Sequence, residues 1–214
     1  MADKQTKAQK AYKQIRKLLI SGHFPPDRRL SLRCLAAQLK MSVVPVSEAV
    51  RKLEQEGLLV TQPQSGIYLR RLKPAEKRQM NLIRQALEVQ AARLVALGQP
   101  KKDLKTLRKL AVTISNQLAK NRPDLAAATD VEFHRRLVGS ARSPMISKQY
   151  ERISAVSMVC GMPLPLNWSQ EESSVHTDIV AALETANPDK AAHAVLEHIK
   201  AEDIFLKRNQ NENK

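Results

Sequence analysis

Residues 30–68 read LSLRCLAAQLKMSVVPVSEAVRKLEQEGLLVTQPQSGIY, a segment that carries two amphipathic patterns in tandem. Apolar side chains recur at helical spacing over residues 32–40 and again over residues 46–53. Ser42 occupies the N-cap position expected of the second helix, and Gly57 suits a left-handed residue at its end. The pattern therefore predicts two short helices separated by a tight turn.

Two short alternating segments follow the second helix. Residues 58–62 and 66–70 alternate apolar and polar side chains, and Gly66 lies at the turn between them. Two helices and a β-hairpin in this order form a winged helix-turn-helix, which places its second helix in the major groove of DNA. We therefore predict a DNA-binding domain of this fold over residues 1–73, opened by an amphipathic helix over residues 10–21.

Positive charge is concentrated in this predicted domain. The chain of 214 residues has a formal net charge of +15. Residues 1–73 account for +10 of it and residues 74–214 for +5. Such a surplus favours a phosphate backbone as partner through counterion release, whereas a solvated basic face is the alternative meaning of a charge excess.

Compartment and redox state are also indicated by composition. No apolar run approaches the roughly 20 residues of a membrane span, and the first ten residues lack the apolar region of a secretory signal. We therefore expect a cytoplasmic protein without a membrane partner. In that setting Cys34 and Cys160 are expected to be small buried residues rather than a disulfide.

Residues 74–214 show long helical periodicity and no strand-like run. Glycine, proline and asparagine interrupt this periodicity at short intervals, which is typical of antiparallel helices in a bundle. The predicted helices cover residues 75–97, 101–120, 123–140, 143–160, 169–186 and 188–208. The last seven residues, RNQNENK, are polar and expected to be disordered.

One carboxylate and three histidines are candidates for a metal site in this bundle. Asp130 and His134 are four residues apart and share one helix face, while His176 and His198 fall on two later helices beside apolar residues. Such a set can bind a divalent first-row metal such as zinc or nickel. The alternative is a group of hydrogen-bonded core histidines. His193 is off the face of His198 and is expected at the surface.

The first part of the chain resembles the DNA-binding domain of the GntR family of bacterial transcription regulators. The resemblance is carried by YKQIRKLLISG at 12–22, LAAQL at 35–39, PVSEAVRKLEQEGLL at 45–59, and the Gly66 wing tip. It departs from the family where a Pro-Gly pair is usual, since this chain has Pro25-Pro26. It also has Val43 and Ser47 where the family usually has DNA-contacting arginines, which implies a different operator sequence. The DNA-binding residues implied by the resemblance are Arg33, Ser42, Val43, Pro45, Ser47, Arg51 and Gly66.

The second part resembles the all-helical FCD ligand-binding domain of the FadR-type branch of that family. The motifs are LIRQALEVQAARL at 82–94, DVEFHRRLV at 130–138, VHTDIVAAL at 175–183, and a helix ending in EHI at Ile199. The resemblance implies a homodimer that binds a metal through Asp130, His134, His176 and His198. It also implies a small organic acid as effector, with Arg84 binding the carboxylate. The alternative for Arg84 is a structural salt bridge to Glu88.

The leading hypothesis is a metabolite-responsive repressor, not an enzyme, that binds a double-stranded DNA operator as a dimer. Two alternatives belong to other functional classes. A metal-dependent hydrolase would use the histidine cluster and keep the basic head for localisation on DNA, although no general base or nucleophile motif accompanies the cluster. A non-specific DNA-organising protein would need no pocket, and its binding would follow salt concentration alone.

Overall fold

The computed structural model describes residues 5–25, 27–160 and 174–212. These residues are mainly helical and include one two-stranded antiparallel sheet, which confirms the predicted fold class. The chain divides into two compact units. One consists of residues 1–77 with a segment that begins at Arg152, and the other consists of the remainder.

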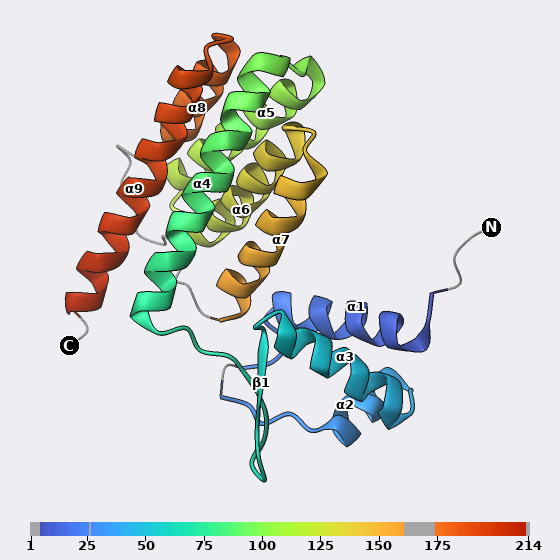
Figure 1. Cartoon of the computed structure of the whole chain (residues 1–214). Coiled ribbons are helices and arrows are strands. Elements are labelled where there is room, and N and C mark those ends of the chain that lie inside the picture. The colour runs from blue at the N-terminus through green and yellow to red at the C-terminus, as the bar shows by residue number, and fades with distance from the viewer. Residues whose placement is uncertain (1–4, 26, 161–173, 213–214) are drawn as a thin grey trace. The chain divides into compact units, whose positions relative to one another are not determined.

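In the described residues before Pro74, the first unit contains three helices (Figure 1): α1 (Lys7–Ile20), α2 (Leu32–Leu39) and α3 (Val43–Gln55). Helix α1 begins three residues earlier than predicted because Thr6 and Gln9 form a capping box. Ser31 caps α2, since its hydroxyl accepts a hydrogen bond of 3.1 Å from the backbone N–H of Cys34. Cys34 itself is exposed, so the expectation that it is buried was wrong, whereas Cys160 is buried; both are free thiols.

The tight turn predicted between α2 and α3 is present. Lys40 ends α2 in the left-handed region, with a φ of 54°. Ser42 is the N-cap residue of α3, as predicted by its position, but its side chain makes no capping hydrogen bond. Gly57, with a φ of +77°, follows the end of α3. Apolar residues of α1 and α3 pack on one another, and Ile15 and Leu53 are fully buried.

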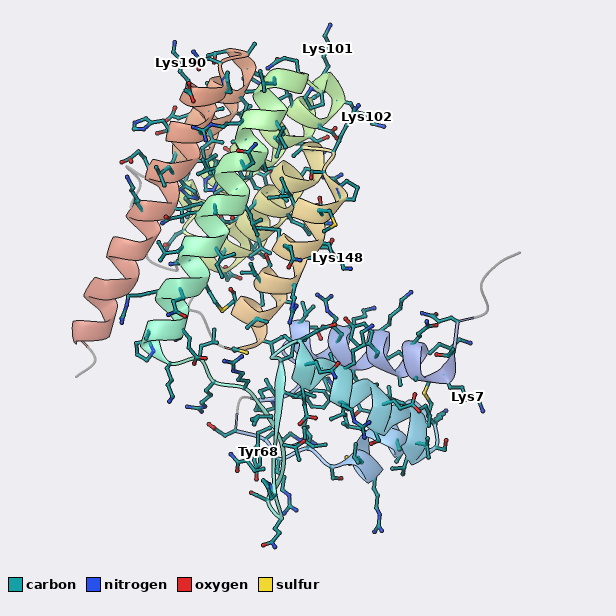
Figure 2. The ribbon with its side chains drawn as sticks, viewed as in Figure 1. Lys7, Tyr68, Lys101, Lys102, Lys148 and Lys190 are labelled. Carbon is teal, nitrogen blue, oxygen red and sulfur yellow. The ribbon has the colours of Figure 1, made fainter. Side chains whose placement is uncertain are left out.

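A β-hairpin completes this unit. Strand β1 (Leu59–Gln62) pairs with β2 (Gly66–Leu69) in antiparallel register. Leu30, just before α2, adds a bridge to Ile67 and thereby joins the hairpin to the helices. At the turn, the hydroxyl groups of Ser65 and Tyr68 (Figure 2) are 3.0 Å apart and hydrogen-bonded.

Gly66 lies at a backbone conformation that only glycine adopts easily, with a φ of +127°. A Cβ atom there would also lie 2.7 Å from Nε of Arg29. Gly66→Ala is therefore expected to lower the free energy of unfolding by about 1–3 kcal/mol in urea denaturation. Gly139→Ala is the matched control, because Gly139 lies in a helix with nothing within 4 Å of the added carbon. An equal loss in both variants would contradict this reading of the wing.

From Pro74 on, the part of the chain that the structure describes contains six helices (Figure 1): α4 (Pro74–Gly98), α5 (Lys101–Ala119), α6 (Pro123–Ser140), α7 (Pro144–Val159), α8 (Val175–Glu184) and α9 (Pro188–Glu212). Helix α5 packs against α6 and α8, and α8 packs against α9. Buried apolar side chains of α4, α5, α6, α8 and α9 form one core that includes Phe133, Leu107, Ile114, Leu137, Ile179, Leu183 and Ile199. The four positions predicted to bind metal are buried on α6, α8 and α9, which contribute to this core.

The C-terminal helix α9 is longer than predicted. Helix α9 continues to Glu212, whereas the predicted helix ended at residue 208; the expected disorder of the RNQNENK segment stays a prediction. The predicted connection at 161–167, the first residues of the helix predicted at 169–186, and Pro26 lie outside the described residues. None of the helices that the structure describes is both long and apolar enough to cross a bilayer.

Candidate functional site

Four potential metal ligands meet inside the second unit. Asp130 and His134 come from α6, His176 comes from α8, and His198 comes from α9. All four side chains are buried, and one ligand atom from each lies within 4.8 Å of the other three. The juxtaposition predicted from sequence is therefore present.

The helices hold these side chains through their own periodicity and through ring packing. Asp130 and His134 are one helical turn apart, so both face the core. The rings of His134 and His198 stack at a centroid distance of 5.0 Å, and Phe133 contacts the ring of His176 edge-on at 4.9 Å. The rotations of the three imidazoles are thus restricted by aromatic neighbours as well as by hydrogen bonds.

Three distances between these ligand atoms are close to those expected around a single small cation. Nε2 of His176 is 2.7 Å from Oδ1 of Asp130, and Nε2 of His134 is 3.2 Å from the same oxygen. The Nε2 atoms of His134 and His198 are 3.0 Å apart. First-row metals bind such ligands at about 2.0–2.2 Å, so neighbouring ligand atoms around one ion lie roughly 3–3.5 Å apart. The donor set fits zinc or nickel, and the same contacts also satisfy these groups as hydrogen bonds.

The electrostatics of the cluster are dominated by burial and by close opposite charges. Burial alone would raise the pKa of Asp130, but His134 and His176 hold that pKa well below its usual range. Burial would lower the pKa of His134, but the carboxylates of Glu88 and Asp130 raise it to about 10. For His176 burial prevails, and its pKa is lowered. The two buried carboxylates therefore favour one positive charge, on His134, whereas burial disfavours a second one on His176.

Arg84 lies on α4 beside the cluster, where its Nε is 2.6 Å from Oε1 of Glu88. The structural salt bridge weighed for Arg84 is thus formed. Glu88 is fully buried, and its second oxygen, Oε2, is 2.5 Å from Nδ1 of His134. Sequence reasoning did not assign Glu88 to the site. The sequence signals only its pairing with Arg84, four residues away. Its contact with His134 joins residues 46 positions apart and leaves no local pattern.

The predicted DNA-binding residues all lie in the first unit, and most are accessible. Arg33, Ser42 and Arg51 are exposed, and Ser47 is half-buried. Val43 is 41% exposed and its neighbour Val44 is 68% exposed, so the beginning of α3 presents apolar groups. Pro45 is buried, and its side chain is therefore not on this surface. Gly66, the last residue of the predicted DNA-binding set, lies at the hairpin turn, where β2 begins.

A groove of about 540 Å³ lies among these elements of the first unit. Its lining includes Arg29, Arg33, Ser47, Arg51 and Gly66. Arg29 was not predicted as a site residue. The Arg29 side chain reaches the groove because it lies close to Gly66, and this proximity cannot be read from its position in a loop of the sequence. Three arginines thus line one groove between the helices and the hairpin.

Comparison with protein families identifies both parts of the chain. The family described as FCD domain matches residues 79–201, and the family described as bacterial regulatory proteins, gntR family, matches residues 7–69. The two matches follow one another along the chain in the order that the sequence motifs indicated.

Curated relatives and solved structures agree with these matches. The Nta operon transcriptional regulator of Aminobacter aminovorans is 29% identical over 184 residues, or 85% of this chain and 86% of that protein. The HTH-type transcriptional repressor RspR of Escherichia coli is 26% identical, covering 96% of this chain and 91% of its own. The structure described as E. coli McbR/YncC has a TM-score of 0.78 at 19% identity, covering 96% of this chain and 99% of its own. That similarity shows the fold.

Proposed function

Since this chain belongs to the GntR family of bacterial regulatory proteins, with an FCD domain, and is a transcription regulator, we propose that it is a metabolite-responsive repressor controlled by a metal and a small organic acid. The observation that carries this proposal is the buried cluster of Asp130, His134, His176 and His198. The domains would divide the work, with residues 1–73 binding DNA and residues 74–214 binding the effector and forming a homodimer. The relatives compared above are described as regulators, not enzymes.

The cluster would hold a divalent ion, with zinc or nickel the best fit to one carboxylate and three imidazoles. Such an ion supplies positive charge and open coordination positions that accept a carboxylate. With neutral histidines, a divalent ion, Arg84, Glu88 and Asp130 together carry a net charge of +1. A carboxylate effector would neutralise this buried charge, which supports an organic acid as the ligand.

Arg84 supports the same class of ligand. Its side chain is 22% exposed and lies one helical turn from Glu88 on α4. A guanidinium carries five N–H donors and can serve two carboxylates at once. We therefore propose that Arg84 binds the effector while it remains paired with Glu88.

The DNA-binding surface would be the exposed part of α3 with the arginines of the groove. Dimeric helix-turn-helix proteins read two half-sites at a fixed separation. An effector that changes the separation of the two heads would therefore weaken operator binding.

Val43 and Ser47 cannot form guanidinium forks with guanine, whereas exposed valines suit the methyl group of thymine. We expect the operator to differ accordingly from those of relatives with arginines there.

A gel-shift titration with the DNA that flanks its own gene tests the proposed function. We expect a shifted band at low salt that survives excess unrelated competitor DNA and is lost when zinc and a cognate carboxylate from a panel are added. The variant Asp130→Asn should keep the shift but lose the response to the acid. Absence of a shift in all conditions would refute DNA-dependent repression. Equal competition by unrelated DNA would favour the non-specific alternative.

A further inference from the structure

Glu88 is a buried carboxylate with two different partners on its two oxygens. Oε1 is 2.6 Å from Nε of Arg84 on the same helix, and Oε2 is 2.5 Å from Nδ1 of His134 on α6. Its side chain is 0% exposed. A carboxylate in such a place is costly unless both oxygens are hydrogen-bonded, and here both are.

The contact with Glu88 determines which nitrogen of His134 faces the other ligands. An ionised carboxylate only accepts hydrogen bonds, so Nδ1–H of His134 is the donor. Nε2 then faces Oδ1 of Asp130 at 3.2 Å and Nε2 of His198 at 3.0 Å. A half-turn of the ring would place carbon atoms against both carboxylates and lose these contacts.

Arg84 holds Glu88 in place from the side opposite His134. Its Nε donates to Oε1 at 2.6 Å, so the second oxygen, Oε2, is left to accept from Nδ1–H of His134 at 2.5 Å. Arg84, Glu88 and His134 thus form a chain of hydrogen bonds that runs from the partly exposed guanidinium on α4 to the buried cluster.

We propose that Glu88 is the positioning residue of the metal centre, which holds the His134 imidazole so that Nδ1–H points to α4 and Nε2 points to the ion. This inference rests on the proposed metal site. Hydrogen-bonded carboxylates behind a histidine ligand fix its orientation and make it more basic, and their loss commonly lowers metal affinity 10- to 100-fold. Glu88 itself would not contact the ion.

Zinc titration against a competing chromophoric chelator tests the proposal with the full-length chain. Glu88→Gln, which keeps the shape but removes the charge, is expected to weaken zinc binding about 10- to 100-fold. Glu132→Gln is the matched control, because Glu132 is on the same helix as Asp130 but pairs with Arg135 and Arg136 outside the cluster. Equal affinities for the wild type and Glu88→Gln would overturn the proposal.

Imidazole nitrogen NMR of the wild-type chain gives a readout that does not depend on folding of a variant. We expect a downfield Nδ1–H proton resonance of His134 in the metal-free and zinc-loaded chain, with zinc on Nε2. Zinc on Nδ1 would overturn the proposal. If the wild type takes up no zinc, the metal site of the proposed function is refuted. In that case the metal-free spectrum still tests the hydrogen bond from His134 to Glu88. A missing Nδ1–H resonance would show that Glu88 does not orient the imidazole, which overturns the proposal.

Discussion

His134→Leu is expected to abolish metal binding and to lower the free energy of unfolding by about 3–5 kcal/mol, the range for breaking a buried ion pair. The imidazole of His134 is 1% exposed and lies between Glu88 and Asp130. Its removal leaves two buried carboxylates without their shared partner. Urea denaturation of the metal-free chain measures the stability change, and zinc titration measures the loss of the site.

His193→Leu is the control for this experiment. His193 lies on α9, as His198 does, but is exposed and outside the cluster. Its replacement should change stability by less than about 0.5 kcal/mol, as is usual for surface positions. A similar loss of unfolding free energy in both variants would show that the contacts of His134 with Glu88 and Asp130 do not stabilise the fold as expected. Retained zinc binding by His134→Leu would remove His134 from the ligand set.

Helical periodicity explains why the cluster could be predicted from sequence. Asp130 and His134 share a face by their spacing, and apolar neighbours orient His176 and His198 toward the core. The winged head was predictable for a similar reason, because caps, turns and alternation are local signals. The observed bounds of α2, α3 and the two strands accordingly lie close to the predicted ones.

Contacts between distant residues explain what the sequence did not reveal. Glu88 joins the cluster through His134, and Arg29 approaches Gly66 across the groove. Neither pairing leaves a periodic trace, since each depends on how separate elements pack. The burial of Cys34 was predicted wrongly because α2 is short. Leu35 and Ala36 occupy its buried face, which leaves the Cys34 thiol on the exposed side.

Reversing the charge of two groove arginines, Arg33→Glu with Arg51→Glu, is expected to weaken operator binding by about 2–6 kcal/mol, or at least roughly 30-fold. Both side chains are exposed and line the groove of the first unit. The substitutions should therefore leave the fold intact. Fluorescence anisotropy with labelled operator DNA measures the affinity, and circular dichroism verifies the helical content.

A matched variant separates the effect of place from the effect of total charge. Lys101→Glu with Lys102→Glu changes the net charge by the same amount at exposed positions at the beginning of α5, where both side chains project away from the bundle (Figure 2). If DNA binding depends on the groove, this variant should retain nearly all of the affinity. If both variants weaken binding equally, the groove is not the DNA-binding surface, and general electrostatic attraction explains binding instead.

The salt dependence of the affinity then adds a second criterion. Loss of phosphate contacts lowers the slope of log affinity against log salt by about one per contact, whereas loss of base contacts relaxes sequence preference at one position.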